Sequence, residues 1–267
     1  MSVRATTDVA EIVERLDRKL AEDPVLHTVL GTVRADEDGL RAAGWCAWDE
    51  GGSLAARAAA RWPVTVTDGW ADLAGLAQAL AALASLAGIA GPQPIVEDLL
   101  DRLGRPATIH HSQRLFRLDE LTEPVGVAGA ARPADADDLG LLAQWLAGFA
   151  VDAHERAPSA EETRTQAERI LSVRHPWLWV DAAGEAVSLA VAQQAAFGVA
   201  RIGPVYTPPD RRGHGFASAA TAQATRHILA AGDVPVLFTD LTNPTSNKIY
   251  QQLGYRPVAD RTQVFLD

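Results

Sequence analysis

The chain has 267 residues, of which 48% are apolar, enough for one large globular domain or two modest ones with buried cores. Acidic residues outnumber basic ones by 34 to 24 and there is no long basic run, which argues against nucleic acid as a partner. The single cysteine, Cys46, cannot form an internal disulfide, and the N-terminus indicates an acidic amphipathic helix rather than a secretory signal. The sequence therefore predicts a cytoplasmic protein.

The first half of the chain, residues 1–124, is predicted to form one domain. Apolar residues at helical spacing indicate two short helices over residues 7–33. The elements expected after them are a hairpin over 44–62, a strand over 63–69, an alanine-rich helix over 70–91, a short helix over 94–104 and a strand over 107–121.

The alanine-rich stretch over residues 70–91 is long enough to be mistaken for a membrane span. Alanine is only weakly hydrophobic, however, and Asp72, Gln78 and Ser85 interrupt the run. A buried or interface-facing helix is therefore favoured, and no membrane partner is expected. The exposed part of this helix could pack against a second copy of the chain, so a homodimer stays open.

The second half, residues 125–267, is predicted to form a second domain in which helices and strands alternate. Pro, Gly, Ala and Asp are frequent over residues 122–138, which indicates a linker followed by a first strand. The elements expected next are helices over 136–156 and 159–173, a hairpin over 177–196, a strand over 199–208, a helix over 215–232, a strand over 234–241, a helix over 244–254 and two strands over 255–260 and 262–267. This alternation is typical of the α/β class.

A weak internal repeat links the two halves. Three residues of the first hairpin recur in the second at a constant offset of 132 residues (177 − 45 = 132), which pairs Trp45 with Trp177, Asp49 with Asp181 and Gly52 with Gly184. A duplicated fold explains this pattern, and so does coincidence, because Trp and Gly are common in hairpins. The halves differ farther along, where only the second has a pair of glycines before a helix.

The stretch RRGHGFA, residues 211–217, joins a predicted strand to a predicted helix. Its glycines allow positive φ and close approach of a ligand, and the first N–H groups of the helix lack partners within the helix. These features favour an anion site, to which Arg212 adds a guanidinium. Ser218 stands where a dinucleotide-binding fingerprint needs glycine, and there is no Gly-Lys-Ser/Thr of a Walker loop. A plain turn also fits this stretch taken alone.

This turn and the later segment NPTSNKIYQQLGY, residues 243–255, together resemble the GNAT superfamily of acetyl-CoA-dependent N-acyltransferases. The turn matches that superfamily's Arg/Gln-x-x-Gly-x-Gly/Ala signature, and the later segment matches the one that follows it. The matching residues are Arg212, Gly215 and Ala217 in the turn and Asn243, Ser246, Tyr250, Gly254 and Tyr255 in the later segment.

The resemblance covers residues 127–267 and implies a mixed, mostly antiparallel central sheet flanked by helices. This GNAT-like arrangement would be complete in residues 125–267. Residues 1–124 look like a reduced GNAT-like half without the cofactor signature, as in two-part members of the superfamily.

The resemblance also implies acetyl-CoA as co-substrate and no metal. The pyrophosphate of coenzyme A would lie on the turn and the pantetheine arm beside the preceding strand. The implied cofactor-binding residues are Val205, Tyr206, Thr207, Arg212, Gly213, His214, Gly215, Phe216, Ala217, Asn243 and Ser246. Asn243 also fits a helix N-cap before Pro244, so both roles stay open. His110 and His111 have no further metal ligands at a convincing spacing.

Pro208 and Pro209 follow the strand that would hold the pantetheine arm. Neither residue has a backbone N–H, so strand pairing is expected to end there. The end of the strand would then leave an open edge for the cofactor.

Tyr250 is the predicted catalytic residue. Attack of an amine on a thioester expels a thiolate, and a phenol near the sulfur can donate a proton to it. A tyrosine that only packs in the core is the alternative. The general base stays open: the strand before the turn carries no acid, and the candidates are Asp240 and the group Asp152, His154 and Glu155 at a helix end.

Taken together, the sequence predicts an N-acyltransferase that moves acetyl from acetyl-CoA to a primary amine by direct attack. No cysteine lies in the cofactor region, which argues against a covalent enzyme intermediate. The acceptor would be a small molecule or a peptide, bound by residues 145–170 and the final strands, and the acidic balance favours a cationic amine. Two alternatives are an acyl-CoA-binding sensor without turnover and a nucleotide-binding protein that uses the same turn.

Overall fold

The computed structural model describes residues 2–153 and 157–266, and the chain divides into two compact units. The first unit comprises residues 1–115, 239–244 and 257–267, and the second comprises residues 116–238 and 245–256. The sequence suggested consecutive halves, 1–124 and 125–267. The two units are instead interleaved, because two later segments return to the first unit.

The first unit starts with a short strand and three helices, and then strands and helices alternate. Its elements are β1 (Arg4–Thr6), α1 (Val9–Glu22), α2 (Thr28–Ala35), α3 (Glu37–Ala43), β2 (Trp45–Trp48), β3 (Leu54–Arg57), β4 (Val64–Val66), α4 (Leu73–Ala81), β5 (Gly88–Gly91), α5 (Gln93–Leu103) and most of β6 (Ala107–Leu118). Helix α1 buries Ile12, Leu16 and Leu20, which recur every four residues on one face.

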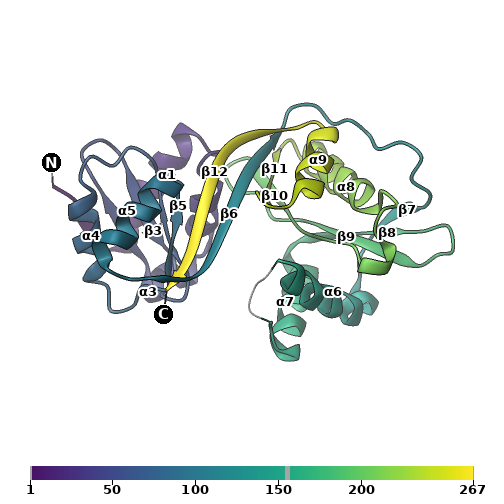
Figure 1. The fold of residues 1–267 in the computed structure, drawn as a ribbon, viewed down its shortest axis with the longest axis horizontal. Helices are drawn as coiled ribbons and strands as arrows, with labels where there is room; N and C mark the ends of the chain where they lie inside the picture. The colour runs from purple at the N-terminus through teal and green to yellow at the C-terminus, as the bar shows by residue number, and fades with distance from the viewer. Residues whose placement is uncertain (1, 154–156, 267) are drawn as a thin grey trace. The chain divides into compact units, whose positions relative to one another are not determined.

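The sheet of the first unit has the strand order β1-β2-β3-β4-β5-β12, in which β12 (Tyr255–Leu266) is the last strand of the chain (Figure 1). Strands β4 and β5 are parallel, and β12 pairs with β5 antiparallel, with Thr262 opposite Gly91. A Cβ at Gly88 would overlap the carbonyl of Val264, so this pairing depends on glycine.

The predicted helix over residues 70–91 is wrong in its second half. Only Leu73–Ala81 is helical, and residues 88–91 form β5 between β4 and β12. A short apolar run in a buried strand has no periodicity that distinguishes it from a buried helix, which explains the error.

The second unit has a similar order of elements, but in the described residues two α-helices follow its first strand where three follow that of the first unit. It contains β7 (Ala130–Pro133), α6 (Leu139–Asp152), α7 (Ala160–Val173), β8 (His175–Val180), β9 (Ala186–Ala192), β10 (Val199–Tyr206), α8 (Phe216–Ala230), most of β11 (Val234–Asp240) and most of α9 (Pro244–Gln252). Its strands follow the order β11-β10-β9-β8-β7, with β10 and β11 parallel and β7 to β10 antiparallel.

Helices cover both faces of the second unit's sheet (Figure 1). On one face α6 and α7 pack on alternate residues of β8 and β9, including Leu178, Leu189 and Val191. On the other face α8 and α9 pack around Ala190, Ala192 and residues of β10. Both faces are apolar because β9 is buried along almost its whole length, as its sequence AVSLAVA predicts.

The two hairpins that share the 132-residue offset close in the same way. Gly52 and Gly184 both have positive φ, 84° and 87°, and each donates its N–H to the carbonyl of the aspartate three residues earlier. Each aspartate carboxylate also accepts from the amide four residues on, Ser53 or Glu185, at 3.0 Å. Identical hydrogen bonding within a similar order of elements favours the duplicated fold over coincidence.

The predicted fold class is confirmed, since the structure is mixed α/β with a largely antiparallel sheet flanked by helices. The first unit is reduced in the length of its elements rather than in their order: β4 has 3 residues where β10 has 8, and α4 has 9 where α8 has 15. Across the described residues, no helix combines the length and apolar character that crossing a membrane requires.

Candidate functional site

The candidate site lies at the end of β10, where its pairing with β11 stops. The parallel register runs from Val199 opposite Val234 to Ile202 opposite Leu237, although both strands continue beyond it. Pro204 offers no N–H to a ladder, and the β9 pairing of β10 shifts register between Ile202 and Val205. The ladder to β11 therefore ends earlier than Pro208, the position that the sequence analysis named.

Side chains of β9 hold the free end of β10 in place. Ser188, fully buried, donates from Oγ to the Tyr206 carbonyl at 3.2 Å, and its Oγ lies 2.8 Å from Thr207 Oγ1. Gln193 donates from its side-chain amide to the Gly203 carbonyl. Sequence reasoning missed both residues, although a lone serine within the apolar run AVSLAVA was a usable signal.

The turn after β10 is exposed and leads directly into α8. Gly213 and Gly215 have positive φ of 82° and 78°, as the glycine pattern predicted. Gly215 is the N-cap of α8 and gives the helix no side-chain cap. The first N–H groups of α8 therefore point out of the helix beside exposed backbone, which is suitable geometry for an anion.

Arg212 is tied into the turn. Its Nε donates to the Thr207 carbonyl at 2.9 Å, and a terminal nitrogen donates to the Asp152 carboxylate at the end of α6. The side chains of this ion pair are 48% and 42% exposed, so solvent screens it and it stabilises the fold little. The guanidinium can exchange Asp152 for another anion at small cost.

The backbone carbonyl of Tyr206 faces β9, and its side chain packs against α6. The phenol lies against Gly148 of α6, where a Cβ would overlap its oxygen, and its ring centroid is 6.2 Å from that of Trp145. Burial and the neighbouring Asp152 raise the pKa of this phenol, while Arg212 opposes the shift. The predicted residues Tyr206, Thr207 and Arg212 are thus brought together.

The remaining residues of the predicted turn are arranged around α8. His214 is exposed and its ring stacks on Phe216, with centroids 5.5 Å apart. Phe216 and Ala217 occupy the first turn of α8 and are half-buried. Val205 packs with the α8 side of the core.

Tyr250 lies on α9 and is buried in the same core cluster as Val205 and α8. Its side chain is 8% exposed, and burial raises its pKa to about 12. Its ring packs edge-on against Tyr255 with centroids 6.3 Å apart at 68°. The phenol therefore stays protonated at neutral pH, in agreement with either a proton donor or a core tyrosine.

The segment before α9 is held by local hydrogen bonds. The Asp240 carboxylate accepts from both the amide and the hydroxyl of Thr242 at 2.7 Å, and Asn243 donates its amide to the Asp240 carbonyl at 3.1 Å. Asp240 thus has the structural role that the sequence left open. Asn243 and Ser246 begin α9 or precede it, and both have further polar interactions.

Some predicted residues lie outside the described part of the chain. His154, Glu155 and the side chain of His110 belong to this group, so their suggested roles stay predictions. In the described residues, no group of three or more His, Cys, Asp or Glu is arranged to hold a metal ion. Cys46 is buried in the first unit, and burial raises its pKa to about 12, so it is an inert thiol.

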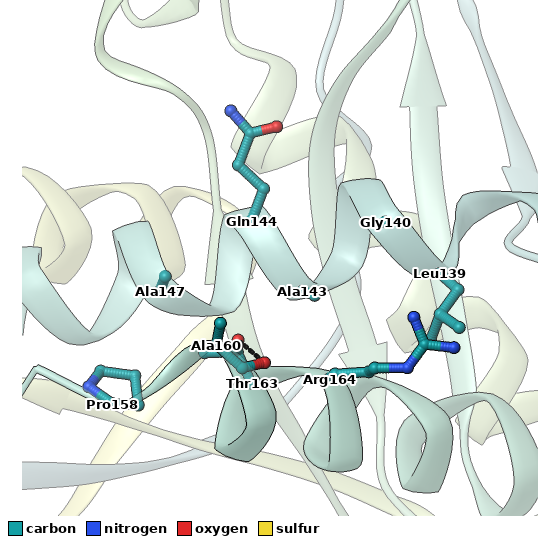
Figure 2. Close-up of a pocket in the computed structure, with 9 residues that line it drawn as sticks. All are labelled: Leu139, Gly140, Ala143, Gln144, Ala147, Pro158, Ala160, Thr163 and Arg164. Atoms are coloured by element: carbon teal, nitrogen blue, oxygen red, sulfur yellow. Dashed lines mark hydrogen bonds between the residues drawn. The ribbon is translucent and has the colours of Figure 1, made fainter.

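A groove of about 570 Å³ lies between α6 and α7 (Figure 2). Four of its nine lining residues are glycine or alanine, namely Gly140, Ala143, Ala147 and Ala160. Figure 2 shows Gln144 pointing away from α7 and Arg164 reaching toward Leu139, and Arg164 also donates to Glu168 at 3.0 Å. Its lining includes none of the predicted cofactor-binding or catalytic residues.

Comparisons with known proteins bear on this site. Residues 183–265, which contain the turn, α8 and Tyr250, match the FR47-like protein family. No curated protein sequence matches the chain.

Several solved structures share the fold. A Drosophila protein is 16% identical with a TM-score of 0.67, and the match covers 99% of this chain and 98% of that one. A GCN5-related N-acetyltransferase from Kribbella flavida is 18% identical, with a TM-score of 0.57 and coverage of 89% and 94%. A GCN5-related N-acetyltransferase-like protein from Streptococcus suis is 16% identical, with a TM-score of 0.56 and coverage of 97% and 100%. At these identities the likeness shows the fold, and it extends over both units.

The family match over residues 183–265 and the shared fold agree with the GNAT-like arrangement that the sequence motifs implied.

Proposed function

We propose that the protein is an acetyl-CoA-dependent N-acyltransferase that transfers an acetyl group to a primary amine by direct attack. The observation that carries this proposal is the exposed, uncapped start of α8, which follows two left-handed glycines at the open end of β10. Backbone N–H groups at the start of α8 and the guanidinium of Arg212 are available there to an incoming anion, as a pyrophosphate needs.

The pantetheine arm would pair with the free edge of β10. The Tyr206 carbonyl accepts from Ser188, so it faces β9. Successive residues of a strand direct their backbone groups to opposite sides, and Val205 is therefore expected to face the side that β11 has left. Its amide can polarise the thioester carbonyl as an oxyanion donor.

Tyr250 would protonate the departing thiolate. Its phenol is neutral across the physiological range because burial raises its pKa to about 12. Tyr250, Val205 and α8 pack in one core cluster, so the phenol and the strand edge belong to the same part of the second unit. In this mechanism the amine attacks the carbonyl carbon, the C–S bond breaks, and the phenol proton goes to sulfur.

One observation favours the alternative of an acyl-CoA sensor without turnover. Strand β10 carries no carboxylate, and Asp240 is engaged by Thr242, so neither provides a free general base. Water or Asp152, once Arg212 leaves it, would have to accept the amine proton.

Thiol release from acetyl-CoA, measured over a panel containing a polyamine, amino acids and a peptide with a free N-terminus, tests the proposal. For an accepted amine, Tyr250→Phe is expected to lower kcat about 100-fold with little change in KM. Tyr206→Phe is the matched control, because its phenol packs against α6, and should change kcat less than about threefold.

The outcomes separate the three functions. Tight coenzyme A binding with no turnover on any amine would favour the sensor. Greater thermal stabilisation by ATP or NAD than by coenzyme A would favour the nucleotide-binding protein.

A further inference from the structure

A chain of buried hydroxyl groups connects α8 to the tyrosine that packs on Tyr250. The Tyr255 oxygen lies 2.7 Å from Thr225 Oγ1, and Thr225 Oγ1 lies 2.8 Å from the Thr221 carbonyl. Tyr255, Thr225 and Thr221 are fully buried, at 0% exposure. Both threonines lie on α8, the helix that begins at the glycine turn.

The direction of this chain follows from counting protons. A threonine hydroxyl has one proton, and Thr225 donates it to the Thr221 carbonyl. Thr225 must therefore accept from Tyr255, so the sequence of donors is Tyr255 to Thr225 to the α8 backbone. This hydrogen bond holds the Tyr255 phenol in position, and the phenol proton is engaged by Thr225.

Tyr255 in turn sets the position of Tyr250. The two rings meet edge-on, with centroids 6.3 Å apart at 68°. No described residue forms a hydrogen bond with the Tyr250 hydroxyl, so packing alone orients that side chain. A shift of the Tyr255 ring would move the Tyr250 ring with it.

A hydroxyl at position 255 is not needed to fill the core, since phenylalanine has the same ring. Burying an unpaired hydroxyl is costly, so a buried phenol with a dedicated acceptor indicates a demand for orientation. The acceptor is on the helix whose first turn would bind the cofactor.

We propose that Tyr255 and Thr225 are positioning residues for Tyr250, and that they align its phenol with α8 and hence with the cofactor. The inference rests on the proposed function, in which Tyr250 is the proton donor. It assigns no contact with substrate to either residue.

Thr225→Val is the first test, because it keeps the shape of the side chain but leaves the Tyr255 hydroxyl without its acceptor. Turnover with acetyl-CoA should fall about tenfold in kcat with KM unchanged. Thr221→Val is the matched control: it is on the same helix and equally buried, but its own hydroxyl has no partner in the described residues. It should leave kcat within about twofold.

The second test asks whether the effect acts through Tyr250. In a Tyr250→Phe background, Thr225→Val should cause no further loss of kcat. Tyr255→Phe, which removes the same hydrogen bond from the other side, should lower kcat about as much as Thr225→Val, and the double variant should lower it no further. Thr225→Ser, which keeps the acceptor, should behave like the parent protein and serves if Thr225→Val does not fold.

A third readout does not depend on turnover. The chain has three tyrosines, so protein labelled with ¹³C at tyrosine Cζ should give three signals, each assignable by a Tyr→Phe substitution. Thr225→Val should shift the Tyr255 and Tyr250 signals and leave that of Tyr206 in place. An unshifted Tyr250 signal in folded Thr225→Val would overturn the positioning role. Full activity of Tyr250→Phe would instead overturn the proposed proton donor, whatever the spectrum shows.

Discussion

Corresponding helices of the two units, α4 and α8, begin in opposite ways. In α4, the N-cap Asp72 accepts from the Gly75 amide at 2.7 Å, and Asp49 accepts from the Ala71 amide at 3.2 Å. Two carboxylates thus occupy the start of the helix. In α8, the N-cap is Gly215 and no side chain caps the helix.

The two helix starts differ in whether side-chain carboxylates already occupy their N–H groups, and therefore in whether an anion can bind to these groups. The N-terminus of a helix carries a partial charge of about +0.5, which attracts a carboxylate or a phosphate equally well. The first unit satisfies that charge from within and stabilises itself. The second has no side-chain cap there, at the position where we propose that the pyrophosphate binds.

The largest effect on coenzyme A binding is expected from Gly215→Asp. This substitution places a carboxylate at the N-cap of α8, where α4 already has one. Repulsion and occupation of the N–H groups should weaken coenzyme A binding more than about 100-fold in calorimetry. Gly215→Asn is the control, since it is equal in size and shares the cost of a positive φ without the charge. Equal losses in both variants would show that shape, not charge, decides binding.

Alkaline pH is expected to lower the stability of the two units to different extents. All three tyrosines lie in the second unit, and burial raises the pKa of Tyr250 from 10.0 to about 12. The folded state favours the neutral phenol, so this stability is complete below pH 10 and is lost as pH rises to about 12.

Urea unfolding at pH 9, 10 and 11 should show a loss of about 1.4 kcal/mol per pH unit for each such phenol above pH 10. Tyr250→Phe should make the loss less steep. The first unit has one comparable group, Cys46, and Cys46→Ala removes its contribution. In Cys46→Ala protein, hydrogen exchange that shows the first unit opening first at pH 11 would contradict this expectation.

Charge at the turn should tune affinity on a smaller scale. Arg212→Gln removes a guanidinium that a phosphate could engage and should weaken coenzyme A binding about tenfold. Asp152→Asn releases Arg212 from its ion pair and should tighten binding by about threefold. If Asp152→Asn weakens binding instead, Asp152 is needed to hold the turn in shape.

The smallest effect on coenzyme A binding is expected in the first unit, where Asp72 caps α4. Asp72→Ala should cost about 1 kcal/mol of stability, typical of a lost N-cap, and should leave coenzyme A affinity unchanged. Thermal unfolding measures the loss of stability, and calorimetry measures the affinity for coenzyme A. A second binding event in this variant would mean that the cap alone had closed a latent site.

Local patterns predicted the parts of the site that depend on local chemistry. Glycine at 213 and 215 and an apolar helix after them were enough to indicate the turn and α8, because positive φ and helical spacing are properties of neighbouring residues. The helix that carries Tyr250 was also predicted, whereas the role of Tyr250 came from the resemblance of the surrounding segment and stays a proposal.

Long-range partners were out of reach. The Arg212 pair with Asp152 joins residues 60 apart in sequence, and the Tyr255 pair with Thr225 joins residues 30 apart. Neither pair produces a periodic pattern in the sequence that could predict it. Pro204 lies within β10 and has no N–H, so it indicated that the pairing of β10 with β11 ends early. The prediction instead placed this end at Pro208 and Pro209.

The pairing of β12 with β5 has a consequence for synthesis on the ribosome. Strand β5 is made early, but its partner, residues 262–265, is translated only after the whole second unit. Until then one edge of β5 has unsatisfied backbone groups, although every other element of the first unit is complete. The first unit should therefore complete its sheet only after the second unit has been translated, and the edge is exposed to aggregation in the interval.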